Sequence, residues 1–185
     1  MPAHTAPHKS PARDPGAWHR LQMCRLLLAD TPGVSACALE LERGGTSYTV
    51  DTLKAIHASH PEVGLTLIVG ADTAITLPSW HEPLELLELA DLAVAERPGT
   101  TRGEVLDQLA ALQRKPSRAR RQEHAVVGFL EMPVMVVSSS AARRRVQRGQ
   151  PVDALVGSAV ARYIAEHGLY RHARERPRGR REAAH

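Results

Sequence analysis

Aromatic side chains are scarce in this chain, at 3% of its 185 residues. Hydrophobic residues nevertheless make up 43%, so we expect a core built from leucine, valine, isoleucine and alanine. Long apolar runs are missing too. No stretch approaches the ~20 residues of a membrane-spanning helix, and the first residues are polar and proline-rich, unlike a signal peptide. The composition therefore favours an ordinary globular domain and argues against a membrane protein.

Cysteine is also rare. The two cysteines, Cys24 and Cys37, suit neither a disulfide framework nor the spacing of a metal site. The ten histidines are scattered, and no Ser-His-Asp order, zinc motif or Walker-type loop stands out. We therefore expect a protein of the reduced cytoplasm whose own side chains hold no metal ion.

Positive charge is concentrated at one end of the chain. The formal net charge is +4, and the segment 171–185, with six arginines and two glutamates, carries all of it. The remaining body is neutral, which argues against a nucleic-acid-binding domain. We expect one domain over residues 1–170, followed by a basic, disordered tail over 171–185.

Helix-like and strand-like segments alternate along the chain. Apolar residues at helical spacing predict a helix from Ala17 that Pro32-Gly33 stops, one from Thr49 onward with Thr49 as the N-cap, and others over 82–90, 103–112, 139–148 and 158–167. Short apolar runs predict strands over 34–41, 65–69, 91–95, 125–131 and 134–137. This alternation indicates an α/β domain with a mainly parallel sheet. The run 65–69 shows no polar alternation, so we expect that strand to be buried on both faces.

The segment from Ser138 to Arg145 leads from a predicted strand into a predicted helix. Helix starts present free backbone N–H groups that bind phosphate. Arg143 near the start of this helix opposes the helix dipole unless an anion lies close by. The sequence therefore indicates a phosphate site with Ser139, Ser140 and Arg143, and a serine-capped surface helix with solvated arginines is the alternative.

Residues 44–49 form a second candidate segment. A glycine turn leads to Tyr48 and Thr49 at a predicted helix start, which together offer N–H donors, hydroxyls and an aromatic ring. A ligand with a carboxylate on a ring would suit this combination. An ordinary turn followed by an N-cap is the alternative.

Other candidate residues follow strands or lie in loops. Asp72 comes just after a predicted strand, where ligands of α/β sheets gather, and Arg97 follows the next strand. Trp80 lies in a loop, from which it would stack on a flat ring or instead pack the loop onto the body. His8 and Lys9 are candidates for phosphate contact, although a solvated loop explains them better when they are considered alone.

Taken together and in order, these segments resemble the bacterial nicotinate-nucleotide adenylyltransferases. The resemblance runs from Pro7 to about Tyr170 and depends on the ordered set of motifs rather than on any one of them. The matching residues are Pro7-His8-Lys9, His19-Arg20 with Met23, Glu40-Leu41 with Arg43-Gly44-Gly45, Ser47-Tyr48-Thr49 with Asp51-Thr52-Leu53, Gly70-Ala71-Asp72, Trp80-His81, Arg97-Pro98-Gly99, Ser138-Ser139-Ser140 with Arg143, Tyr163-Ile164 and His167-Gly168-Leu169-Tyr170.

The resemblance implies a Rossmann-like nucleotidyltransferase fold and a role for each candidate residue. Tyr48 and Thr49 would meet the nicotinate end, with the carboxylate on backbone N–H groups near Thr49 and His81. Trp80 would stack on the pyridine ring. Asp72 and Arg97 would lie beside the dinucleotide. The resemblance also implies that the phosphates of ATP would be held by Ser139, Ser140 and Arg143.

The chain departs from the family in one respect. The family opens with a strand and a glycine-rich turn, followed by two histidines in an HxGH pattern that stabilise the triphosphate during transfer. Nothing in this sequence matches them, and His4 and His8 belong to a different segment. The catalytic residues are therefore unassigned. We expect the N-terminal strand and helix of the fold to be missing and the natural protein to begin upstream of Met1.

The resemblance also implies the reaction, which is transfer of AMP from ATP to nicotinate mononucleotide. The products are nicotinate adenine dinucleotide, an intermediate of NAD biosynthesis, and pyrophosphate. Mg²⁺ is expected to accompany ATP, with mainly water and phosphate ligands. A catalytically inactive nucleotide-binding domain and an adenylyltransferase for another phosphate, such as phosphopantetheine, are the alternatives; Trp80 and Tyr48-Thr49 argue against the latter. The sequence leaves open whether the protein is a homo-oligomer, and whether it prefers nicotinate or nicotinamide mononucleotide.

Overall fold

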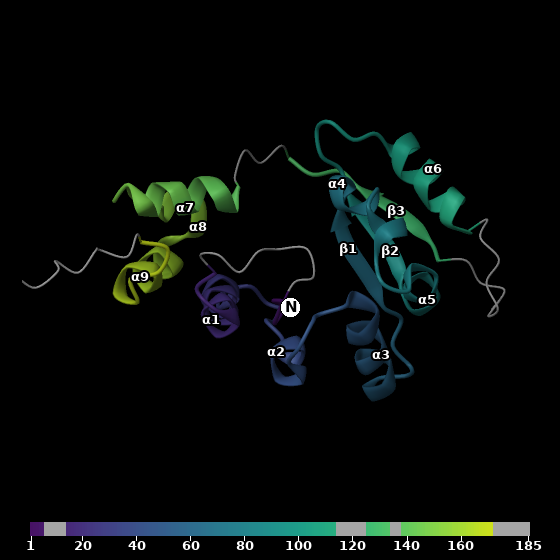
Figure 1. Ribbon diagram of the computed structural model, residues 1–185, viewed down its shortest axis with the longest axis horizontal. Coiled ribbons are helices and arrows are strands. Elements are labelled where there is room, and N and C mark those ends of the chain that lie inside the picture. Colours follow the sequence, from purple (N-terminus) through teal and green to yellow (C-terminus); the bar gives the residue numbers. More distant parts are fainter. Residues whose placement is uncertain (6–13, 114–124, 134–137, 172–185) are drawn as a thin grey trace, which may run out of the picture. The chain divides into compact units, whose positions relative to one another are not determined.

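The computed structural model describes residues 1–5, 14–113, 125–133 and 138–171 (Figure 1). The chain divides into two compact units. Unit 1 comprises residues 1–10 and 38–136, and unit 2 comprises residues 11–37 and 137–185. The strand predicted over 134–137 and all of the predicted tail except Arg171 lie outside the described residues.

Unit 1 contains a parallel sheet and the helices that accompany it. In chain order its elements are α2 (Leu39–Arg43), α3 (Thr49–Ser59), β1 (Thr66–Gly70), α4 (Ala71–Ala74), the 3-10 helix η1 (Leu77–Ser79), α5 (Pro83–Leu89), β2 (Asp91–Ala95), α6 (Arg102–Gln113) and β3 (Val127–Leu130). The strands lie in the order β1-β2-β3, and both pairings are parallel. Gly70, Ala95 and Leu130 are neighbours at the carboxyl ends of the three strands. The α/β architecture with a parallel sheet is therefore confirmed.

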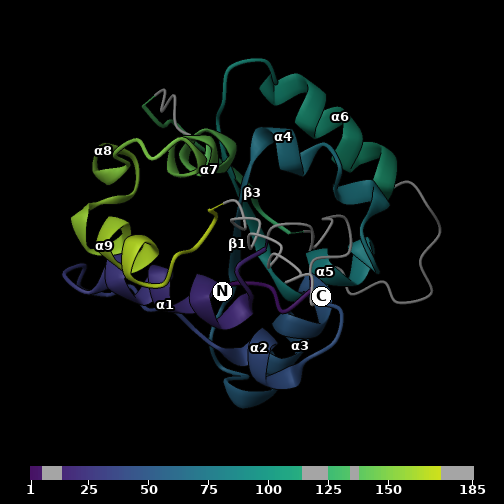
Figure 2. The same cartoon turned by 60° about the vertical axis from the view of Figure 1, so that its left-hand side comes forward.

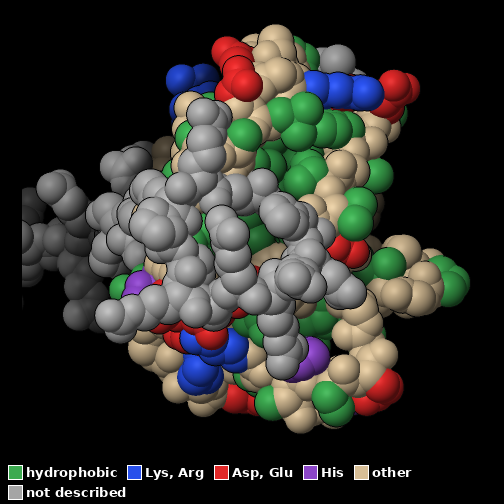
Figure 3. Space-filling view, turned by 90° about the vertical axis from the view of Figure 1, so that its right-hand side faces the viewer, with side chains coloured by type: hydrophobic (Ala, Val, Ile, Leu, Met, Phe, Trp, Pro, Cys, Tyr) green, Lys and Arg blue, Asp and Glu red, His purple; other side chains and the backbone are tan. Residues whose placement is uncertain are grey.

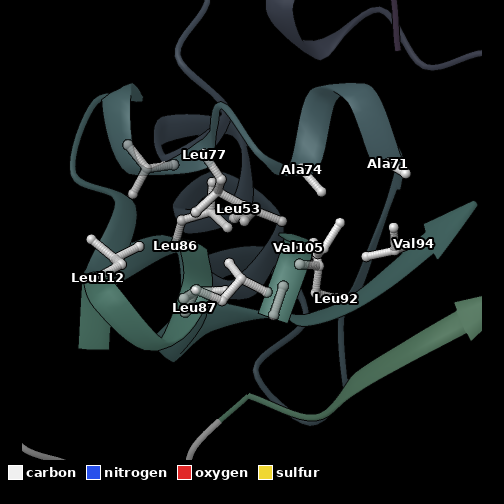
Figure 4. Packing of buried hydrophobic residues seen from close by; sticks show 13 residues of the cluster. Leu53, Ala71, Ala74, Leu77, Leu86, Leu87, Leu92, Val94, Val105 and Leu112 are labelled. Carbon is white, nitrogen blue, oxygen red and sulfur yellow. The ribbon is translucent and has the colours of Figure 1, made fainter. Parts of the chain in front are cut away.

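The main core lies between one face of this sheet and the helices α4, α5 and α6 (Figure 4). Leu92 and Val94 of β2 are 1% and 0% exposed, and they pack in one cluster with Leu86 of α5 and Val105 of α6. Burying one such side chain contributes ~1.5–3 kcal/mol to the free energy of unfolding. Leucine, valine and alanine thus form the core, as the scarcity of aromatic residues predicts.

The prediction that the strand at 65–69 is buried on both faces is wrong. Ile68 is 66% exposed, and Val126 and Leu130, on the same face of the sheet, are also exposed. Figure 3 shows hydrophobic side chains reaching the surface among charged ones. Within the described part of unit 1, the helices that pack on the sheet lie on its other face, so only every second side chain of β1 packs against the main core, and these side chains are partly buried.

The strand predicted over 34–41 is wrong as well. Residues 34–38 have no regular structure, and the helix α2 begins at Leu39. A strand needs a neighbouring strand to satisfy its backbone groups, and no described strand pairs with this segment. A helical turn satisfies part of its backbone locally, and it places Leu41 inside at 5% exposure.

The other predicted helices and strands within the described residues are confirmed to within two residues. The helix α3 begins at Thr49, and Val50 and Leu53 in its first turns are buried. Its N-cap position, however, is occupied by Tyr48 and not by Thr49. The aromatic ring of Tyr48 therefore lies at the N-cap position of α3, immediately before the first helical residue.

Unit 2 is helical in its described residues and consists of α1 (Ala17–Leu28), α7 (Ser139–Gln147), α8 (Asp153–Val156) and α9 (Ser158–Glu166). The helix α1 packs against α9, and α8 lies next to α9 (Figure 2). A second core forms here around Val160, Ile164 and Leu169, with Met23 and Leu26 of α1 packed against it. Among the described residues of both units, no helix combines the length and the hydropathy of a membrane span.

Candidate functional site

Tyr48 and His81 are in contact at the starts of two helices. Tyr48 is the N-cap of α3, and His81 lies two residues before α5. Their ring centroids are 4.3 Å apart, and the ring planes meet at 33°. His81 is exposed, whereas Tyr48 is half-buried against the main core. The structure thus brings together two residues to which the family resemblance gives one role.

The first turn of α3 adds hydrogen-bond donors beside this ring pair. The first N–H groups of an α-helix have no acceptor within the helix, and they carry the positive end of its dipole. Thr49 is the first residue of α3, so its N–H is one of these donors. Thr49, Tyr48 and His81 together provide ring surface and N–H groups suited to a carboxylate on an aromatic ring.

Trp80 is half-buried and packs against the main core. Its indole Nε1 donates a hydrogen bond to Thr76 Oγ1 over 3.1 Å, and its backbone N–H donates to the carbonyl of Leu77 over 3.0 Å. These contacts hold the loop on the body, which is one of the two roles considered for this residue. Because part of the side chain remains exposed, Trp80 is also able to meet a ligand.

Asp72 and Arg97 meet beyond the carboxyl ends of two neighbouring strands. Asp72 follows β1 by two residues, and Arg97 follows β2 by two residues. Arg97 Nη1 lies 3.8 Å from Asp72 Oδ2, and both side chains are more than half exposed. An exposed pair at this distance contributes only ~0–1 kcal/mol to stability. The two groups are therefore available to a ligand at the edge of the sheet where ligands of such folds bind.

Gly70 leaves the space that this pair occupies. A Cβ atom on Gly70 would lie 2.6 Å from Asp72 Oδ1 and 3.2 Å from Arg97 Nε. Both distances are shorter than ordinary van der Waals contact. The glycine of the Gly70-Ala71-Asp72 motif thus has a steric reason that sequence analysis did not reveal.

The first residues of the chain hold the turn that precedes Tyr48. Gly44 has φ 71°, a left-handed conformation that glycine adopts without strain. Ser47, which is 9% exposed, donates its N–H to the carbonyl of Thr5 over 2.9 Å, and its Oγ accepts from the N–H of His4 over 2.9 Å. Residues near the start of the chain therefore help to place Tyr48, which sequence analysis missed because the contacts span more than 40 positions.

Glu40, Arg43 and Thr52 form a hydrogen-bonded link between α2 and α3. Thr52 Oγ1 donates to Glu40 Oε1 over 2.9 Å and accepts from Arg43 Nη2 over 3.2 Å. Thr52 is only 4% exposed, and a buried hydroxyl without partners is costly. Within unit 1, these three motif residues therefore hydrogen-bond to one another and connect the two helices.

The start of α7 has the features predicted for a phosphate site. Ser138 is the N-cap, and its Oγ accepts a hydrogen bond from the N–H of Ala141 over 3.1 Å. Ser139 and Ser140 open the helix, so their N–H groups have no acceptor within it. Arg143 Nη2 donates to Ser140 Oγ over 3.3 Å. The structure thus brings Ser139, Ser140 and Arg143 to one helix start, as predicted.

The positive charge on α7 is not neutralised by the described part of the chain. Arg143, Arg144 and Arg145 form no ion pair with a carboxylate in the described ranges, whereas Lys54 and Arg102 in unit 1 each hold two. Arg144 and Arg145 lie in the last turn of α7, where positive charge is favourable to the helix dipole, and Arg143 is the fifth of its nine residues. The dipole therefore disfavours these arginines less than the sequence suggests, and a bound anion would balance the charge of Arg143 that no described carboxylate neutralises.

A cluster of rings joins α1 to α9 in unit 2. His19 Nδ1 and the hydroxyl of Tyr163 share a hydrogen bond of 2.8 Å, and the ring of His167 lies 4.2 Å from that of Tyr163. Burial raises the pKa of the Tyr170 phenol, and the nearby charge of Arg143 acts in the opposite direction. The C-terminal motif residues therefore hold unit 2 together, and Tyr170 and Arg143 lie close enough to interact electrostatically.

Some candidate residues fall outside this account. His8 and Lys9 lie outside the described residues. Within the described ranges, no three His, Cys, Asp or Glu side chains gather closely enough to hold a metal ion.

The fold and these strand-end groups define a nucleotidyltransferase of the cytidylyltransferase-like class, and a family model described as Cytidylyltransferase-like matches residues 2–145. Two curated relatives narrow the class. A protein of Herpetosiphon aurantiacus is 41% identical over 154 residues, which cover 83% of this chain and 73% of the relative. One of Albidiferax ferrireducens is 40% identical over 173 residues, which cover 94% and 82%. Both are named "Probable nicotinate-nucleotide adenylyltransferase", and the chain belongs to this family.

A solved structure shows the same fold at much lower identity. The nicotinic acid mononucleotide adenylyltransferase of Plasmodium falciparum, complexed with NaAD, superposes with a TM-score of 0.66 at 18% identity. The match covers 90% of this chain and 78% of that one. Agreement over so much of both chains confirms the nucleotidyltransferase fold.

Proposed function

We propose that this protein transfers AMP from ATP to nicotinate mononucleotide, giving nicotinate adenine dinucleotide and pyrophosphate for NAD biosynthesis. The observation that carries the proposal is the contact of Tyr48 with His81 at the start of α3, where ring surfaces and helix N–H donors meet. A ligand with a carboxylate on a pyridine ring would use the ring surfaces for stacking and the N–H donors for its carboxylate. The names of relatives that are 33–41% identical to this chain support the same activity.

The reaction is a displacement at phosphorus. An oxygen of the 5′-phosphate of nicotinate mononucleotide bonds to the α-phosphorus of ATP, the bond from that phosphorus to the bridging oxygen breaks, and pyrophosphate leaves with the electron pair. No covalent intermediate on the enzyme is needed. Catalysis then consists of aligning two phosphates and stabilising negative charge.

Four residues of unit 1 would bind the nicotinate end. The carboxylate would accept hydrogen bonds from N–H groups near Thr49 and His81, and the rings of Tyr48 and Trp80 would contact the pyridine. The half-buried position of Trp80 supports this assignment, because a ring already held by Thr76 loses little freedom on binding.

The phosphates and the ribose would meet different groups. Ser139, Ser140 and Arg143 at the start of α7 would hold the phosphates of ATP, and the absence of carboxylate partners for Arg143 among the described residues supports this role. Asp72 and Arg97, beyond the carboxyl ends of β1 and β2, would lie beside the dinucleotide.

Magnesium would reach the enzyme as part of its substrate, bound to ATP. Mg²⁺ keeps several water ligands and binds nucleotide phosphates readily. We expect the ion to be held mainly by phosphate oxygens and water. Its chemistry would be to neutralise negative charge on the leaving pyrophosphate. Since the substrates are intracellular nucleotides, we place the protein in the cytoplasm.

A pyrophosphate-release assay tests the proposal. The chain is supplied with Mg²⁺, ATP and one acceptor, either nicotinate mononucleotide, nicotinamide mononucleotide or phosphopantetheine. We expect pyrophosphate and nicotinate adenine dinucleotide to form in equal amounts with the first acceptor, and the second to be used less well. Faster release with phosphopantetheine would contradict the proposal.

A second candidate function is nucleotide binding without transfer. It is favoured by one observation, that no segment of this sequence matches the HxGH histidines of the family. Calorimetric titration with both nucleotides separates the candidates. Binding of nicotinate mononucleotide and ATP with no pyrophosphate released would support the second candidate and reject the first.

A further inference from the structure

We infer that Lys54 and Glu82 are positioning residues for the nicotinate end of the site, because their ion pair holds the loop that carries His81 against Tyr48. The inference depends on the proposed function, since it assigns a purpose to residues outside the site itself. Neither Lys54 nor Glu82 is among the motif residues, although Glu82 directly follows His81 and also interacts with it electrostatically.

Glu82 has an unusual backbone conformation. Its φ of 46° and ψ of 55° lie in the left-handed region, which side chains other than glycine rarely adopt and which must be held by surrounding contacts. Glu82 directly follows His81 and is the N-cap of α5. The direction in which the chain leaves His81 therefore depends on whatever keeps Glu82 in this conformation.

The carboxylate of Glu82 does not cap its own helix. It makes no capping hydrogen bond to α5 and instead accepts one from Lys54 Nζ over 2.9 Å. The same Nζ lies 2.9 Å from Glu85 Oε2 in the first turn of α5. Lys54 thus holds two carboxylates of α5 from a position on α3.

The ring contact and the ion pair join the same two helices. Tyr48 is the N-cap of α3, and Lys54 lies on α3 six residues later; Glu82 is the N-cap of α5, and His81 directly precedes it. The two helices pack against each other (Figures 1 and 2). The ring contact at 4.3 Å and the ion pair at 2.9 Å therefore both connect α3 with the start of α5.

The ion pair persists at working pH. The hydrogen bonds to Glu85 and Glu82 raise the pKa of Lys54 to about 12, and the hydrogen bond from Lys54 lowers the pKa of Glu82 below its ordinary value of 4.5. Both groups are therefore charged near pH 7. The side chains are nearly half exposed, at 40% and 45%, so their effect on binding is expected to be modest and to act through the geometry of the loop.

The test uses the fluorescence of Trp80, which directly precedes His81. The full chain has two tryptophans, so Trp18→Phe leaves Trp80 as the only tryptophan, whose emission is followed with excitation beyond the absorption of tyrosine. Titration with nicotinate mononucleotide should change its emission and give a Kd. In this background we expect Lys54→Met and Glu82→Gln each to raise that Kd about five-fold, while the Kd for ATP alone stays within two-fold.

The signs of the two effects separate positioning from simple attraction of an anionic ligand. If Lys54 only attracted the substrate phosphate, Lys54→Met would weaken binding but Glu82→Gln, which removes a negative charge, would strengthen it. Positioning predicts that both weaken it. Lys54→Arg, which keeps the pair, should bind nearly as the parent does, and Glu88→Gln, an exposed carboxylate on α5, is the matched control.

Each outcome decides one question. Unchanged Kd values for Lys54→Met and Glu82→Gln, or opposite effects of the two, would overturn the inference while leaving the proposed function intact. A parent chain whose Trp80 does not respond to nicotinate mononucleotide, and which shows no calorimetric binding, would instead reject the proposed function. Thermal midpoints within roughly 5 °C of the parent confirm that the variants are folded.

Discussion

At the scale of single residues, Gly70 shows how a residue without a Cβ atom leaves room for the candidate site. The pair Asp72–Arg97 occupies the volume that any Cβ at this position would need. The backbone of Gly70 has an ordinary conformation with φ −71°, so the requirement for glycine is steric and not conformational. A substitution at Gly70 is therefore expected to displace Asp72 or Arg97 and to leave the backbone largely unchanged.

Gly70→Ala is expected to impair substrate use with little loss of stability. The new methyl group must displace Asp72 or Arg97, both of which are exposed and able to move, so we expect kcat/KM to fall roughly ten-fold, which corresponds to ~1.4 kcal/mol. Steady-state kinetics and calorimetric melting measure the two effects. Gly64→Ala is the control, because nothing lies within 4 Å of a Cβ there. Equal activity of both variants would show that the pair has no part in the reaction.

Arg143 is the second residue whose role is decided locally. It is half-buried, lies in the first turns of α7 and donates a hydrogen bond to Ser140. Arg143→Ala should raise the KM for ATP roughly ten-fold or more, since hydrogen bonds to charged groups contribute ~1.5–3 kcal/mol, and should change the KM for nicotinate mononucleotide far less. Arg148→Ala, exposed at the end of the same helix, is the control. An unchanged ATP dependence would refute the assignment.

At the scale of elements, α6 begins with a reciprocal pair of capping bonds. Glu104 Oε2 accepts from the N–H and the hydroxyl of Thr101 over 2.7 and 2.9 Å, and Thr101 Oγ1 accepts from the N–H of Glu104 over 3.2 Å. This capping box satisfies donors that the helix leaves unpaired. The helix also contributes Val105 and Leu109 to the main core, so its start matters for the stability of unit 1.

The capping box predicts a pH dependence of folding. The hydrogen bond from the N–H of Thr101 lowers the pKa of Glu104 below its ordinary value of 4.5. The resulting stability is fully present above the pKa of the unfolded state and is lost as the pH falls through the lower folded pKa. Glu104→Gln should therefore destabilise the protein near pH 7 and make progressively less difference towards pH 3. Urea unfolding across this range measures the effect, with Asp107→Asn as a control on the same helix; a difference independent of pH would contradict it.

At the scale of the whole molecule, the described residues form two core clusters, one in each unit. The buried residues of unit 1 cluster around β2, α5 and α6, and those of unit 2 cluster around α9. The two clusters share no residue. Loss of packing in one unit should therefore be felt first within that unit.

Ile164→Ala tests this separation. Removing this 6% exposed side chain should cost ~2–5 kcal/mol locally. Hydrogen exchange followed by mass spectrometry should then be faster in α1 and α9, with little change in β2. Leu27→Ala, at a 61% exposed position of α1, should alter neither. Equal acceleration in β2 would mean that the two units unfold together.

Local pattern was sufficient for most elements of the fold. The helices α1 and α5 and the strand β2 appear where apolar spacing predicts them, because each buries one side against its neighbours. The serine-capped start of α7, for which phosphate binding stays a prediction, also lies where the sequence places it, since the cap, the free N–H groups and an arginine lie within a few residues. The same spacing misled at 34–41 and at Ile68. There the outcome depends on whether another strand or helix covers the segment, which no local pattern reports.

By itself, then, the amino-acid order determined the α/β class, the parallel sheet and the family, because these follow from short-range spacing and from motifs, and it supplied the residues that we propose to meet substrate. Only the tertiary structure decided that Tyr48 contacts His81, that Lys54 holds Glu82 from 28 positions away, and that Gly70 must lack a side chain. The physical reason is distance along the chain: hydrogen bonds and steric contacts depend on separation in space, and folding brings together residues that the sequence keeps apart.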